Sequence, residues 1–62
     1  MNSQLLTPSD VSDILKINYR KVLELILLGV IPAYQVGRQY RISQIDLNNY
    51  LSKNKVKGFT QL

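Results

Sequence analysis

The 62-residue chain contains neither cysteine nor histidine. Without cysteine it has no disulfide, no thiolate nucleophile and no zinc–thiolate site. Without histidine it lacks the most common general base and the most common metal ligand. No glycine-rich phosphate loop is present either. These absences argue against an enzyme, so we expect no catalytic residues, no cofactor and no bound metal.

Acidic residues and long apolar runs are also scarce. Four Asp/Glu stand against eight Lys/Arg, which gives a formal net charge of +4 and a pI near 9.7. This balance favours a polyanionic partner such as double-stranded DNA, although many small proteins are mildly basic. The apolar run 25–28 is far too short to cross a bilayer, and no signal peptide is evident. We therefore expect a cytoplasmic protein with no membrane contact.

The length allows one domain with a small core. Segment 7–15 is predicted to be its first helix, because it begins with an N-cap, a first-turn proline and a capping-box aspartate, namely Thr7, Pro8 and Asp10. Apolar residues at helical spacing form the face expected to be core: Val11, Ile14 and Leu15. Leu5 and Leu6 precede this helix and are open to two interpretations, a short strand or a simple cover over the core.

The segment Asn18–Gly29 is predicted to be the helix that enters a DNA major groove. Asn18 is a good N-cap and Gly29 a good C′ residue, because glycine adopts a positive φ without steric cost. The core stripe is Val22, Leu25 and Ile26. Residues 16–18 join this segment to the first helix as a helix-turn-helix. The predicted DNA-contact residues of the second helix are Asn18, Tyr19, Arg20, Lys21, Leu23 and Glu24.

Three leucines of the second helix lie outside its core stripe: Leu23, Leu27 and Leu28. One interpretation is that the sheet or the third helix covers them. The other is a surface for a protein partner, since clustered exposed leucine is unusual on a monomer. Leu23 has a further interpretation as an apolar contact to a thymine methyl group.

Residues 31–36 and 39–42 are rich in strand formers and are separated by Gly37-Arg38. Glycine at the first position of a two-residue loop is the signature of a type II′ hairpin. The resulting register pairs Ala33 with Ile42, Gln35 with Tyr40 and Tyr34 with Arg41. We predict a basic wing that contacts phosphates or a minor groove through Arg38, Gln39, Tyr40 and Arg41. A solvated turn is the alternative.

Residues 43–51 are predicted to form the third helix. Ser43 and Asp46 have capping-box spacing. Leu47, Tyr50 and Leu51 share a face expected to pack on the first two helices, whereas Ile45 points away. We therefore predict an α+β fold, a small winged helix-turn-helix of three helices and a hairpin, over residues 1–51. Residues 52–62 are predicted to be a basic tail that attracts phosphates, with Lys53, Lys55 and Lys57, and Phe59 as a candidate anchor.

The ordered set of these motifs resembles the excisionase-type helix-turn-helix domain, a small relative of the MerR-type winged helix. The resemblance covers Leu5 to Leu51. It is carried by the segments 6–11, 14–15, 22–26, 29–37, 40–42 and 46–51, and is most specific in Gly29–Gly37 followed by Tyr40-Arg41-Ile42.

The resemblance implies a noncatalytic DNA-binding module that acts in excision of mobile elements or in transcription control. Excisionases of this kind bind adjacent sites, bend DNA and help an integrase choose excision. By position, the resemblance places Tyr19, Arg20, Lys21, Leu23 and Glu24 in the groove and Arg38, Gln39 and Arg41 in the wing. Expected partners are therefore double-stranded DNA, an integrase or recombinase, and further copies of the chain on adjacent sites. The alternative is a winged-helix protein-interaction module that docks a partner through Leu23, Leu27 and Leu28.

Overall fold

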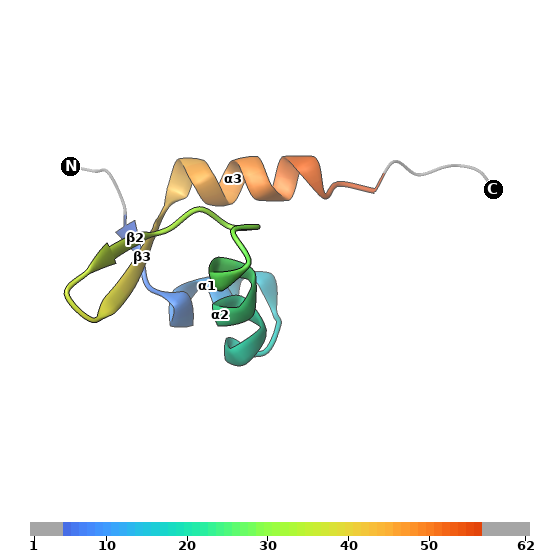
Figure 1. The fold of residues 1–62 in the computed structure, drawn as a ribbon. Coiled ribbons are helices and arrows are strands. Elements are labelled where there is room, and N and C mark those ends of the chain that lie inside the picture. The colour runs from blue at the N-terminus through green and yellow to red at the C-terminus, as the bar shows by residue number, and fades with distance from the viewer. Residues whose placement is uncertain (1–4, 57–62) are drawn as a thin grey trace.

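The computed structural model describes residues 5–56 and has three helices and a small antiparallel sheet (Figure 1). The elements in chain order are β1 Leu5–Leu6, α1 Pro8–Leu15, α2 Tyr19–Leu27, β2 Tyr34–Val36, β3 Gln39–Ser43 and α3 Gln44–Lys53. The strand order in the sheet is β1-β3-β2. The predicted α+β winged helix-turn-helix is confirmed, and Leu5 and Leu6 do form a short strand, paired with Ser43 and Ile42 of β3.

The first helix begins with the predicted capping box. The Thr7 hydroxyl accepts a hydrogen bond from the Asp10 N–H at 2.9 Å, and the Asp10 carboxylate accepts one from the Thr7 N–H at 3.0 Å. The helix ends at Lys16, whose φ of 60° and ψ of 40° lie in the left-handed region. The Ser12 hydroxyl donates to the Ile17 carbonyl at 2.7 Å, which closes the turn to α2 without a glycine.

Both ends of α2 are capped as predicted. The Asn18 side-chain oxygen accepts from the Arg20 N–H at 2.7 Å. Gly29 has a φ of 78°, and its N–H donates to the Ile26 carbonyl at 3.0 Å while the Val30 N–H donates to the Leu25 carbonyl at 2.9 Å. These two bonds are those of a Schellman motif, which stops the helix and turns the chain toward the sheet.

The hairpin has the predicted register, with Tyr34 opposite Arg41 and Gln35 opposite Tyr40. Gly37 has a φ of 64°, as the first position of a type II′ turn requires. The expected strand start at Ile31 is wrong, and the Ala33–Ile42 pair lies outside the ladder, because β2 begins at Tyr34. The reason is that Ile31 packs in the core instead of pairing in the sheet. Its side chain is fully buried, and its N–H donates to the Leu25 carbonyl.

The core lies between α1, α2 and the inner face of β3. Its buried residues are Val11, Val22, Ile26, Ile31, Ile42 and Leu47. Two predicted core positions are wrong, since Ile14 is 48% and Leu51 43% exposed. Helical positions turn by about 100°, so Ile14 lies on the side of Val11 away from the buried Pro8. Leu51 lies on the side of Leu47 away from Tyr50, which packs on the core.

The third helix starts directly where β3 ends. The Ser43 hydroxyl accepts from the Asp46 N–H at 3.0 Å, but over residues 5–56 the reciprocal Asp46–Ser43 bond of the predicted capping box does not form, because Ser43 is also the last residue of β3. Helix α3 continues to Lys53, two residues past the expected domain boundary, and Ile45 is 72% exposed as expected. Lys57 and Phe59 of the expected tail lie outside the described residues. No helix in the described part is long and apolar enough to span a membrane.

Candidate nucleic-acid interface

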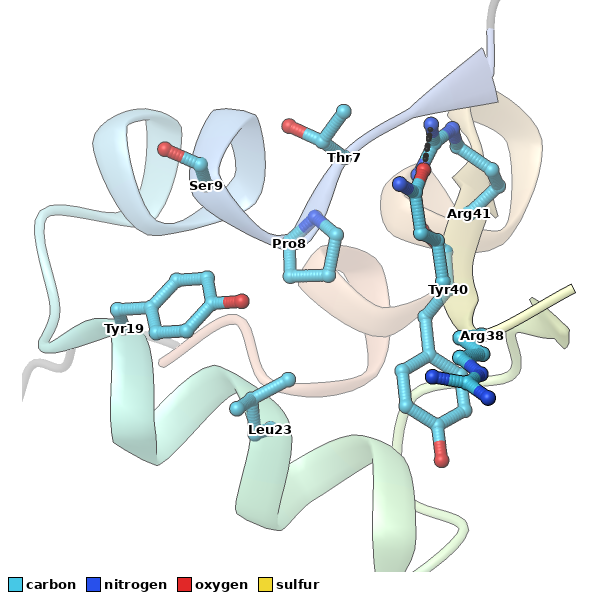
Figure 2. A pocket seen from close by; sticks show the side chains of 9 residues that line it. Thr7, Pro8, Ser9, Tyr19, Leu23, Arg38, Tyr40 and Arg41 are labelled. Carbon is cyan, nitrogen blue, oxygen red and sulfur yellow. Dashed lines mark hydrogen bonds between the residues drawn. The ribbon is translucent and has the colours of Figure 1, made fainter. Parts of the chain in front are cut away.

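A hollow of about 490 Å³ separates α2 from the hairpin (Figure 2). Its walls come from three elements that are distant in sequence: the start of α1, the first turns of α2 and the wing. The lining residues are Thr7, Pro8, Ser9, Tyr19, Leu23, Arg38, Gln39, Tyr40 and Arg41. The structure therefore brings the predicted helix residues Tyr19 and Leu23 to the same site as all four predicted wing residues.

On the helix side, the predicted contact residues are accessible. Tyr19 is 48% exposed, and Arg20 is exposed at the start of α2. Lys21 and Glu24 form an ion pair at 3.5 Å, with each side chain 55% exposed. This pairing partly neutralises both side chains, so Arg20 is the cation of α2 that has no acidic partner among the described residues.

Some predicted residues of α2 lie beside the hollow rather than in it. Arg20, Lys21 and Glu24 are exposed on the helix, but they do not line the cavity. Asn18 is exposed, and its side-chain oxygen is already used to cap the helix. The structure thus divides the predicted recognition residues into those that face the wing and those that project outward from α2.

On the wing side, the two arginine side chains differ in how they are held by hydrogen bonds. The Arg41 guanidinium donates to the Tyr40 carbonyl at 2.8 Å and to the Gln39 side-chain oxygen at 2.6 Å, so it is held along the hairpin. Arg38 is exposed at the tip, and within residues 5–56 its side chain has no hydrogen-bond partner. Arg38 is therefore the wing cation that can reach an anion without first breaking a protein contact.

Sequence reasoning missed the contribution of α1 to this site. Thr7, Pro8 and Ser9 line the hollow, although the sequence pattern predicts only a helix start for this segment. Figure 2 shows the Pro8 ring pointing toward Tyr19 and Leu23. No local signal marks such a role, because it depends on how α1 crosses α2.

The three leucines outside the core stripe have different surroundings. Leu23 is half-buried and lines the hollow, whereas Leu27 and Leu28 are 71% and 66% exposed. The interpretation that the sheet or α3 covers all three is wrong for Leu27 and Leu28, at least in the part of the chain that the structure describes. Val30, 46% exposed, follows them, so we define Leu27, Leu28 and Val30 as the apolar end of α2.

Comparison with known proteins places most of the chain in one group. A family model described as a helix-turn-helix domain matches residues 5–55. The uncharacterized protein YvgK of Bacillus subtilis (strain 168) is 46% identical over 44 residues, which cover 71% of this chain. The same stretch covers 14% of YvgK, so the chain spans only a small part of that relative's length. No solved structure matches the chain.

Proposed function

The chain belongs to the helix-turn-helix domain family, of the excisionase type, and from this we propose that the hollow between α2 and the wing is where it holds double-stranded DNA. The observation that carries the proposal is the shared lining of this hollow. Tyr19 and Leu23 of α2 and Arg38 of the wing meet there although the chain separates them. A winged helix-turn-helix needs its second helix and its wing side by side if both are to contact one duplex.

The proposed docking places α2 in a major groove and the wing at the neighbouring minor groove. The major groove is about 12 Å wide and admits a helix, whereas the minor groove is about half as wide and admits single side chains. One sugar–phosphate strand separates these two grooves. In this docking that strand crosses the hollow between α2 and the wing.

The chemistry of the lining fits a crossing strand. Ser9 and Tyr19 offer hydroxyl donors, and Arg38 offers a guanidinium that no protein group engages within residues 5–56. These groups suit phosphate oxygens, which fix orientation without reading sequence. Arg20, which projects outward from α2, is the group that we assign to a base edge, where arginine prefers the two acceptors of guanine.

We propose no catalytic step for this chain. Its role is to bind and bend DNA, either to direct site-specific excision of a mobile element or to regulate transcription. A module of this size is expected to bind a single site weakly, so affinity would come from copies on adjacent sites or from a bound recombinase. An in vitro excision reaction with and without the protein, beside a reporter assay of transcription, separates the two roles.

The first test is whether binding depends on salt as phosphate contacts require. If Arg38 and two lysines each displace a counterion, the logarithmic salt slope is about −2.7, and affinity falls roughly 40-fold between about 50 and 200 mM salt. Fluorescence anisotropy with a short duplex measures this slope. The variant Arg38→Ala should reduce its magnitude by about one. No binding to any duplex at the lowest salt contradicts the proposal.

A second candidate function, docking of a protein partner, is favoured by the apolar end of α2. Leu27 and Leu28 follow each other in the chain, and their side chains are 71% and 66% exposed. No charged residue lies between Leu25 and Val30. The proposed partner is a second copy of the chain on an adjacent site. This function and DNA binding are compatible, because the apolar end of α2 does not line the hollow.

The variant Leu27→Glu tests this docking. It should shift a self-associating protein to the monomer in size-exclusion chromatography, because an isolated carboxylate cannot be buried in an apolar contact. Its binding to a single DNA site should stay unchanged. Ile45→Glu is the matched control, since Ile45 on α3 is 72% exposed. A wild-type protein that stays monomeric at high concentration and on DNA with adjacent sites contradicts this second function.

A further inference from the structure

Leu23 is partly buried without belonging to the core. It is half-buried, yet it is not among the partly buried side chains that pack on the core cluster, namely Leu6, Leu15, Ile17, Leu25, Ala33, Tyr40 and Tyr50. It lines the hollow instead, together with residues of α1 and the wing. Figure 2 shows its side chain rising from α2 into the cavity, between the Tyr19 ring and the wing.

Leu23 lies on the same side of α2 as Tyr19, and both line the hollow. The two residues are four apart on α2, so they lie on the same side of the helix, one turn from each other. Tyr19 is the first residue of α2, and the first turns of such a helix are those that meet base edges. Leu23 thus presents an apolar side chain, with no hydrogen-bonding capacity, at the side of α2 that faces the crossing strand of the proposed docking.

We propose that Leu23 contacts the C5-methyl group of a thymine, and that this contact makes the protein selective for thymine at one position of its target. This inference rests on the proposed DNA binding. Among the base-pair edges of the major groove, the thymine methyl is the apolar group. It lies on the side of the groove next to its own sugar–phosphate strand, which is the side that Leu23 faces.

The proposal also predicts where this thymine lies. Arg20 and Leu23 are three residues apart, which corresponds to about 4.5 Å along the helix axis. Stacked base pairs are about 3.4 Å apart. The thymine contacted by Leu23 is therefore one or two base pairs from the guanine that we assign to Arg20.

The experiment replaces thymine by uracil, which removes the methyl group and keeps base pairing. A binding duplex is first selected from random-sequence DNA, and each thymine is then replaced in turn by deoxyuridine. Loss of one buried methyl should weaken binding roughly fourfold at a single position. The variant Leu23→Ala should bind the thymine and the uracil duplex equally, whereas Leu23→Met should keep a preference for thymine.

The control variant is Ile45→Ala, which truncates an exposed apolar side chain on α3, outside the hollow. It should keep the full uracil effect, and thermal unfolding should show that all three variants are folded. Equal binding of every uracil duplex overturns the methyl contact but leaves DNA binding intact. A uracil effect that persists in Leu23→Ala overturns the assignment to Leu23. Failure to select any duplex contradicts the proposed function itself.

Discussion

Replacing Ile42 by alanine is expected to unfold a large part of the protein population. Ile42 is fully buried, pairs with Leu6 across β1 and β3 and belongs to the core cluster. Truncating such a side chain costs about 2 to 5 kcal/mol. A chain of this length is expected to have a stability of only about 3 to 9 kcal/mol. Urea unfolding followed by far-UV circular dichroism measures the loss.

The matched control is Ile45→Ala, three residues along the chain. Ile45 is 72% exposed on α3, so the same truncation removes almost no buried surface there. Its effect on the free energy of unfolding should stay within about 0.5 kcal/mol. Equal effects of the two variants would mean that the inner face of β3 is not the centre of the core.

Replacing Arg20 by alanine is expected to abolish most of the sequence selectivity of DNA binding. A bidentate arginine–guanine contact discriminates against other bases by about 1 to 3 kcal/mol, which is a factor of roughly 5 to 150. The selected duplex should lose affinity by such a factor, whereas a scrambled duplex should lose much less. Competition binding with both duplexes, at fixed salt concentration, gives this ratio directly.

Two variants separate selectivity from simple charge. Arg20→Lys keeps the positive charge but lacks the planar guanidinium, so it should keep affinity for scrambled DNA and lose selectivity. Lys53→Ala removes a cation from the last turn of α3 and should weaken binding to both duplexes alike. If Arg20→Ala and Lys53→Ala have the same effect on both duplexes, Arg20 does not contact a base.

The caps and the hairpin could be predicted from sequence because their causes are local. Thr7 and Asp10 are three residues apart, and their two hydrogen bonds need nothing outside that turn. Gly37 likewise determines the hairpin register through its own φ. Each of these features depends on a few adjacent residues, so spacing and residue type suffice.

The errors occur where the packing of helices and strands against one another decides which residues are buried or line the hollow. Ile14 has the right spacing for a core face, but the way α1 lies on its neighbours buries Pro8 and Val11 and leaves Ile14 48% exposed. Ile31 has strand propensity, but the core uses it instead. The part of the hollow formed by α1 was missed for the same reason, since Ser9 and Arg38 are 29 positions apart and meet only through the fold.

The central position of β3 limits how far the wing can move relative to the helices. This strand leaves the hairpin tip, pairs with both β1 and β2, and passes at Ser43 straight into the first turn of α3. A swing of the whole strand would disturb Ile42, which is fully buried. We therefore expect the separation between the wing and α2 to be largely fixed before DNA binds. Little conformational entropy of the protein would then be lost on binding. We therefore expect a duplex whose groove spacing does not match this separation to deform on binding.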